Sequence, residues 1–102
     1  MKQLEIYLTS NLQQQIDSDL TGRILAMLIP LFRLYPFDMF VIEPDEQEKL
    51  QIRLAGYNFF THELDEKTII SGTELPGERV IWLKVDDYGD VYIGTLLLSE
   101  DY

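Results

Sequence analysis

The side chains best suited to chemistry in this chain are its carboxylates, which gather where turns are predicted. They lie at Glu43, Asp45 and Glu46, at Glu63, Asp65 and Glu66 after His62, and at Asp86, Asp87 and Asp90. Grouped carboxylates bind cations or present a negative surface to a basic partner. Charged turns also keep a small protein soluble. Two interpretations therefore stay open: a solvated surface, or a binding surface that imitates the phosphate spacing of nucleic acid.

Metal and catalytic sites find little support among these residues. Asp86–Asp90 lacks the alternating spacing and the distal Glu of a helix–loop–helix calcium site, and a hairpin turn accounts for it. His62 is the single histidine, there is no cysteine, and no serine has a nucleophile motif. We expect no enzyme activity, cofactor or metal. Acid–base chemistry by His62 with Glu63 or Asp65 is the residual enzymatic hypothesis.

The net charge of −10 comes from 18 acidic and 8 basic residues, and it is unevenly distributed. Through Arg33 three bases balance three acids, so the whole excess lies from Leu34 onward. This charge opposes direct binding to nucleic acid or to an anionic membrane, and it favours a basic protein as partner.

The 102 residues fit one domain, 1–102, with a single core. The absence of cysteine is typical of a cytoplasmic protein. The N-terminal residues lack a secretory pattern, and the central apolar run is shorter than the ~20 residues that span a membrane. We therefore expect a soluble, cytoplasmic protein.

The elements that must position these residues begin with a strand over residues 2–9, which alternate in polarity. Ser10 is predicted to cap the following helix together with Gln13. The apolar stretch Leu20–Tyr35 predicts a helix that is buried on most of its faces. Poor helix formers at 18–22 predict a division there, and Pro30 predicts a kink or break near 26–30.

Strands are predicted at 37–43 and 49–55, joined as an antiparallel hairpin. Residues 56–60 either extend the second strand past a bulge at Gly56 or begin a loop. A short strand is expected at 68–70, and an ordered loop at 71–78.

The last hairpin is predicted from strands at 79–85 and 91–98, with a three-residue loop at 87–89. This register pairs Val85 with Val91 and Leu83 with Ile93 on the core face. Lys84 would then face Tyr92, and Trp82 would face Gly94, on the outer face. Trp82, Tyr92 and Leu96, with Val80, would form an aromatic patch there, either exposed or covered by 57–60 or 71–78.

The predicted fold is α+β: an antiparallel sheet of about five strands packed on one long or kinked N-terminal helix, in β-α-β-β-β-β order. No motif identifies a family. In composition alone the chain resembles phage-encoded inhibitors and toxin-neutralising immunity proteins. The predicted function is a non-enzymatic protein-binding module for a basic partner, and the alternative is a homodimeric structural subunit. The partner-binding residues are predicted to be Glu43, Asp45, Glu46, Trp82, Asp86, Asp87, Tyr88, Asp90 and Tyr92.

Overall fold

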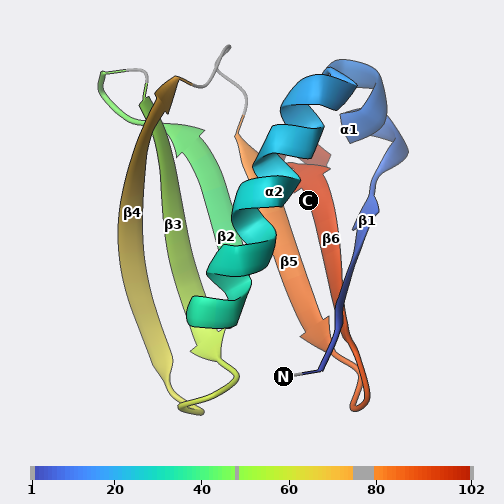
Figure 1. Cartoon of the computed structure of the whole chain (residues 1–102), viewed down its shortest axis with the longest axis vertical. Helices are drawn as coiled ribbons and strands as arrows, with labels where there is room; N and C mark the ends of the chain where they lie inside the picture. The colour runs from blue at the N-terminus through green and yellow to red at the C-terminus, as the bar shows by residue number, and fades with distance from the viewer. Residues whose placement is uncertain (1, 48, 75–79, 102) are drawn as a thin grey trace.

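A six-stranded sheet carries both α-helices of the described chain on one of its faces (Figure 1). The computed structural model describes residues 2–47, 49–74 and 80–101. The predicted α+β class and its element order are confirmed. The elements are β1 (Leu4–Leu8), α1 (Ser10–Gln15), α2 (Ser18–Leu34), β2 (Phe37–Pro44), β3 (Lys49–Asn58), β4 (Leu64–Glu74), β5 (Ile81–Asp87), β6 (Tyr92–Leu98) and the 3-10 helix η1 (Ser99–Asp101).

The strand order across the sheet is β1-β6-β5-β2-β3-β4. Four neighbouring pairs are antiparallel, whereas β1 and β6 run parallel, so the sheet is mixed. The first and the last strand of the chain therefore lie side by side at one edge of the sheet. β1 and β4 are its two edge strands (Figure 1).

The helical segment divides earlier than predicted. Ile16 and Asp17 are extended, and Asp17 caps α2 by accepting the Asp19 N–H at 2.7 Å. The predicted Ser10 cap is wrong, because β1 ends at Leu8 and leaves Thr9 as the extended residue before the helix. The Thr9 hydroxyl accepts the Leu12 N–H at 3.3 Å and takes the capping role.

Helix α2 is buried on one side only, which corrects the prediction of burial on most faces. Thr21, Ile24, Leu28 and Phe32 face the sheet, while Ile29 stays 38% exposed. On the opposite side of the helix, Ala26, Pro30 and Arg33 are exposed. The helix also continues unbroken through Pro30. Pro30 leaves the Ala26 carbonyl without its helical donor, and Ala26 lies on the exposed side of the helix.

The core lies between α2 and the inner face of the sheet. The rings of Phe32 and Phe40 lie 6.1 Å apart at its centre, and both are fully buried. Around them pack alternating aliphatic residues of the central strands. The helix and sheet are thereby held as one two-layer unit.

Strand β3 continues past a bulge at Gly56 rather than ending in a loop there. Gly56 has a φ of 95°, and a Cβ atom at this position would lie 2.1 Å from a carboxylate oxygen of Asp38. That carboxylate accepts the Tyr57 N–H at 2.9 Å. Only glycine tolerates both the conformation and the close approach.

Strand β4 is longer than the predicted strand at 68–70. Its bounds, Leu64–Glu74, include residues 71–74 of the predicted loop. The remainder of that loop, 75–78, and the predicted strand start at Arg79 lie outside the described residues.

The register of the β5–β6 hairpin differs from the predicted one. Val85 pairs with Gly94, three residues beyond the predicted Val91. The Tyr88 N–H donates to the Val91 carbonyl at 3.0 Å, so the turn between these two residues consists of Gly89 and Asp90. Gly89 has a φ of 92°. A displacement by an odd number of residues turns every β6 side chain to the other face.

The predicted outer patch of Trp82, Tyr92 and Leu96 is therefore wrong. Trp82 pairs with Leu97 on the outer face, whereas Leu96 faces the core opposite Leu83. Lys84 faces Thr95 rather than Tyr92. Tyr92 is only 6% exposed and belongs to the core.

Candidate functional site

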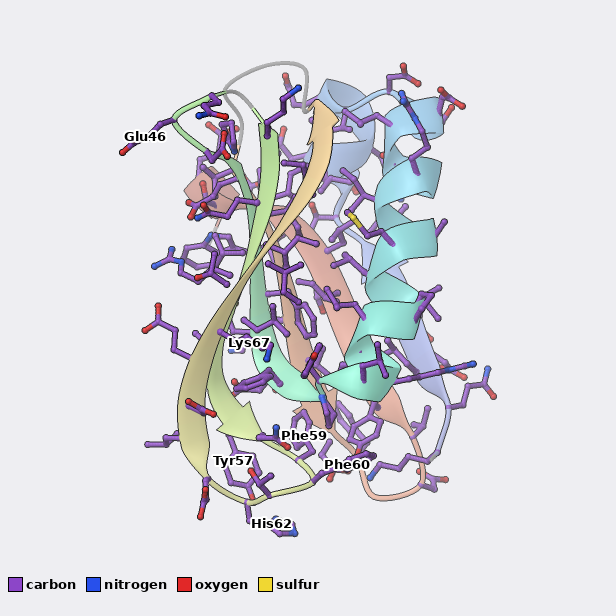
Figure 2. All side chains as sticks on the ribbon, turned by 60° about the vertical axis from the view of Figure 1, so that its left-hand side comes forward. Glu46, Tyr57, Phe59, Phe60, His62 and Lys67 are labelled. Atoms are coloured by element: carbon purple, nitrogen blue, oxygen red, sulfur yellow. The ribbon has the colours of Figure 1, made fainter. Side chains whose placement is uncertain are left out.

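Two loops emerge at the same end of the sheet and form the candidate site. The β3–β4 loop follows Asn58, which pairs with Phe37 at the start of β2. The β5–β6 loop follows Asp87, and its strand β5 pairs Lys84 with Met39 near the same end of β2. We name residues 57–63 and 86–91 together the two-loop end. The β2–β3 turn with Glu46 lies at the opposite end of the sheet (Figure 2).

The β3–β4 loop is held by hydrogen bonds of Asn58. Its side-chain oxygen accepts the N–H groups of Phe60 at 2.8 Å and Thr61 at 3.1 Å. Its carbonyl accepts the His62 N–H at 2.9 Å, and its N–H donates to the Glu63 carbonyl at 2.9 Å. The backbone is thus ordered, yet the Phe60 side chain is 55% exposed at its tip.

His62 closes this loop in a left-handed conformation, with a φ of 61°. Histidine adopts this region more readily than most residues with a Cβ atom. The Tyr57 hydroxyl lies 2.6 Å from its Nδ1 atom. The ring is exposed, and it lines neither the groove beside β1 nor the hollow at the β2–β3 turn.

An aromatic cluster joins the bases of the two loops. The Phe59 ring lies 5.1 Å from Tyr92 and 5.6 Å from Tyr57, and Tyr92 lies 5.1 Å from Phe32. Tyr92, predicted to bind a partner, is instead the buried centre of this cluster. Packed aromatic rings of this kind fix the relative positions of the elements that carry them.

The β5–β6 loop is tied to the start of the chain through Lys2. The Lys2 ammonium pairs with the Asp87 carboxylate, donates to the Gly89 carbonyl at 2.8 Å and lies 4.3 Å from the Tyr92 ring centre. The Lys2 ammonium and the Gly89 N–H lower the pKa of Asp87 below its usual 3.8. Asp87 is therefore an ionised side chain that is paired within the chain and holds the loop in place.

Asp86, Tyr88 and Asp90 are exposed residues of this loop, as are the paired Asp87 and Gly89. Tyr88 is 65% exposed, and both carboxylates are free of hydrogen bonds and ion pairs within the described part of the chain. An accessible aromatic ring flanked by unpaired carboxylates is able to bind a basic, partly apolar surface.

The acidic residues of the β2–β3 turn are used differently. The Asp45 carboxylate accepts the N–H groups of Gln47 at 2.8 Å and Lys49 at 2.9 Å, so it shapes the turn. Glu43 contacts Gln51 at 3.3 Å and Arg53 at 3.6 Å, beside a shallow hollow of about 850 Å³. Of the three predicted residues, only Glu46 is an exposed carboxylate free of partners in residues 2–47, 49–74 and 80–101.

Trp82 alternates along β5 with the core residues Ile81 and Leu83, so it lies on the opposite face of the sheet. No described helix covers that face (Figure 1). Trp82 lies opposite Val41 of β2 on one side and opposite Leu97 of β6 on the other. Both of these side chains are buried. Trp82 is the second residue of β5, at the end of the strand that lies away from the β5–β6 loop. The structure therefore separates the nine predicted partner-binding residues into four places: two opposite ends, the outer face and the core.

Phe60 and Lys2 are parts of the site that sequence reasoning missed. The polar run Thr61-His62-Glu63 after an apolar strand signals a turn, so an aromatic residue at its tip was recognisable. Lys2 gave no such signal, because its partner Asp87 is 85 residues away.

Comparison with known protein families, curated proteins and solved structures found no match for this chain. Among the described residues, no group of three His, Asp or Glu side chains is arranged to hold a metal ion. No helix in the described ranges is long and apolar enough to cross a membrane. The function has to be argued from the geometry of this chain.

Proposed function

We propose that the chain is a non-enzymatic protein-binding module that recognises a basic partner through the two-loop end. The observation that supports this is the exposure of Tyr88 and Phe60 on two ordered loops, with the unpaired carboxylates of Asp86 and Asp90 beside Tyr88. Exposed aromatic residues on an ordered backbone bind with little loss of conformational freedom.

Electrostatics supports the same proposal. The charge of −10 lies entirely from Leu34 onward, so the two-loop end belongs to the anionic part of the chain. Such a field steers a cationic partner toward the surface and speeds association. The partner we propose is a nucleic-acid-handling protein whose basic groove receives the acidic loop, as an inhibitor or an immunity-like protein would block it. Direct binding to nucleic acid is not proposed, since the charges repel.

The test is capture of partners from a lysate of the source organism on the immobilised chain, washed at low and at high salt. A basic protein retained at low salt and released at high salt is expected. With that protein purified, Asp86→Asn combined with Asp90→Asn should lower its association rate about tenfold. Tyr88→Ala should weaken binding by about 30-fold.

The matched control is Glu46→Gln combined with Glu66→Gln, which changes the net charge equally at exposed positions outside the two-loop end. This control should bind within about twofold of the unchanged chain. Equal losses in the control and in the Asp86/Asp90 variant would mean that only total charge matters, and the two-loop end would then not be the site.

The second candidate function is a structural subunit that associates with itself. The observation that favours it is the sheet face that carries Trp82 and has no described helix over it. Trp82 is only partly buried there, and a tryptophan of this kind is able to contact a second copy of the chain. Light scattering tests it: a dimer that dissociates in Trp82→Ala supports this candidate, and a dimer insensitive to that change argues against it.

A further inference from the structure

The β1 edge of the sheet is open in the described chain. β1 pairs with β6 on one side, and no described element lies along its other side (Figure 1). An edge strand carries a row of N–H and C=O groups that are able to pair with another strand.

The hydrogen bonds to β6 show which groups of β1 face outward. The Gln3 carbonyl accepts the Tyr92 N–H at 2.9 Å, and the Thr9 N–H donates to the Leu96 carbonyl at 3.1 Å. Alternate residues of a parallel strand point to opposite sides, so the odd-numbered residues bond to β6. The backbone groups of Leu4, Ile6 and Leu8 therefore face outward. Within residues 2–47, 49–74 and 80–101, only the Leu8 carbonyl has a hydrogen bond there, a long one of 3.4 Å from the exposed Gln13 side chain.

The two edges of the sheet differ in their protection. β4 begins with Leu64 and then carries the exposed charges of Asp65, Glu66 and Lys67. Charged side chains, proline and bulges are the usual means of preventing edge-to-edge pairing. β1 has Glu5 as its single charge, and it has neither a proline nor a bulge.

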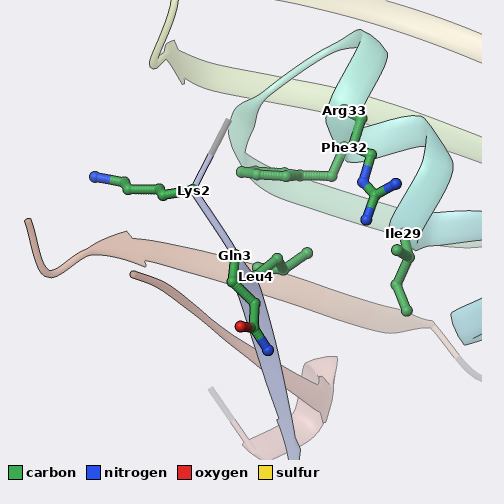
Figure 3. A pocket seen from close by; sticks show the side chains of 6 residues that line it. All are labelled: Lys2, Gln3, Leu4, Ile29, Phe32 and Arg33. Carbon is green, nitrogen blue, oxygen red and sulfur yellow. The ribbon is translucent and has the colours of Figure 1, made fainter. Parts of the chain in front are cut away.

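A groove runs between β1 and the C-terminal half of α2. In Figure 3, Ile29 and Arg33 extend from α2 toward Leu4. The groove measures about 660 Å³, and its floor is Phe32. Leu4, Ile6 and Leu8 are only half-buried on this side, so the core is incompletely covered at this edge.

Charge makes this edge the place where two copies of an anionic chain are able to approach. From residue 2 to residue 33 three bases balance three acids, namely Lys2, Arg23 and Arg33 against Glu5, Asp17 and Asp19. β1, α1 and α2 all lie within this neutral segment. Repulsion between two chains of charge −10 is therefore smaller across these elements than across the acidic turns, although Asp87 and Asp101 lie near their ends.

We propose that two copies of this chain form a dimer by antiparallel pairing of their β1 strands, centred on Ile6. A two-fold axis at Ile6 places Leu4 opposite Leu8 of the second copy, and it pairs all five residues of the strand. The outward N–H and C=O groups of both strands are then satisfied. The half-buried side chain of Leu4 gains a directly opposed apolar neighbour beside the groove.

This register brings Glu5 opposite Tyr7 of the second copy on the outer face, at two equivalent places. Tyr7 is 58% exposed, so the monomer tolerates substitution there. Tyr7→Glu sets two carboxylates opposite each other at both places, and Tyr7→Lys creates attraction at both. Cross-strand pairs of this kind predict a dimer Kd raised about 2- to 30-fold in the first variant and lowered in the second.

Sedimentation equilibrium of the full chain and its Tyr7 variants is the test, with circular dichroism to confirm that each is folded. Thr68→Glu and Thr68→Lys are matched controls, because Thr68 is exposed on the opposite edge strand. The controls should leave the dimer Kd within about twofold. Added salt should tighten the dimer, because it screens repulsion between like chains, whereas it should weaken binding of a basic partner at the two-loop end. The two proposals are therefore separable.

Amide hydrogen exchange gives a second readout without any substitution. Protection of the amides of Leu4, Ile6 and Leu8 should rise with protein concentration, while the amides of Glu5 and Tyr7 stay protected throughout. A chain that remains monomeric at high salt and hundreds of micromolar concentration would overturn the proposal. A dimer whose Kd is unchanged by the Tyr7 variants but which dissociates in Trp82→Ala would also overturn the proposal. Pairing of β1 with a different protein, and not with a second copy, would do the same.

Discussion

The β2–β3 turn and the β5–β6 loop are similar in composition, yet they use their carboxylates differently. At the β2–β3 turn, Asp45 and Glu43 are bonded to neighbouring backbone and side-chain groups. At the β5–β6 loop, Asp87 is bonded, whereas Asp86 and Asp90 have no partner within the described residues and lie beside the exposed Tyr88. Clustered acids alone therefore do not identify a binding surface. We propose that the carboxylates without partners next to an exposed aromatic residue are the better candidates.

The largest effect that distinguishes the parts of the two-loop end is expected for Tyr92→Ala. Tyr92 is buried between Phe32 and Phe59, so removal of its ring leaves a cavity. We expect a loss of about 3–5 kcal/mol in the free energy of unfolding, measured by urea denaturation. A variant of unchanged stability that fails to bind the partner would contradict this, because Tyr92 would then be a residue that contacts the partner directly.

A smaller effect is expected for Asp45→Ala at the other end of the sheet. This change removes the acceptor for two backbone N–H groups, of Gln47 and Lys49. The free energy of unfolding should fall by about 1–2 kcal/mol. Asp86→Asn is the matched control and should stay within about 0.5 kcal/mol of the unchanged chain. Equal stabilities of the two variants would remove the contrast between the acidic turns.

Within the two-loop end, Tyr57→Phe should cost still less. The substitution removes only the hydroxyl that contacts His62, and it keeps the ring against Phe59. We expect a loss of about 0.5–1 kcal/mol in the free energy of unfolding, because the contact is exposed. Binding of the basic partner should change little. A tenfold loss of binding without a loss of stability would instead mean that the Tyr57–His62 contact itself is needed to bind the partner.

The smallest effect concerns pH and Asp87. Its pKa is lowered in the folded state by the Lys2 ammonium and the Gly89 N–H, so its ionised form stabilises the fold. That contribution is fully present well above the unfolded-state pKa of 3.8 and is lost as the pH falls through the lower folded-state pKa. Carbon-13 NMR should show the Asp87 carboxyl titrating below 3.8, and Lys2→Ala should move it upward. Titration of Asp87 at the same pH in both proteins would show that Lys2 does not hold it.

Features set by local periodicity were predictable from the sequence. The alternation of Leu4, Ile6 and Leu8 located β1, and the apolar stretch Leu20–Tyr35 located α2, although not the single side on which the helix is buried. These signals depend on neighbouring residues alone, and the α+β class followed from them.

Features that depend on long-range pairing were not predictable. The face of Tyr92 is set by the exact length of the hairpin tip at Gly89, and an odd displacement in register reverses it. The parallel pairing of β1 with β6 and the Lys2–Asp87 contact join opposite ends of the sequence. The candidate site was therefore predicted in part: Asp86, Tyr88 and Asp90 lie together, whereas Glu46, Trp82 and Tyr92 lie elsewhere.

The most direct test of the two-loop end is a hydrogen-exchange footprint of the captured basic partner on this chain. The account predicts slower exchange at residues 57–63 and 86–91 in the complex, with the β2–β3 turn at 45–47 unchanged. Protection confined to 45–47, or to the strand residues around Trp82, would contradict it, because the surface in contact would then lack Tyr88 and Phe60.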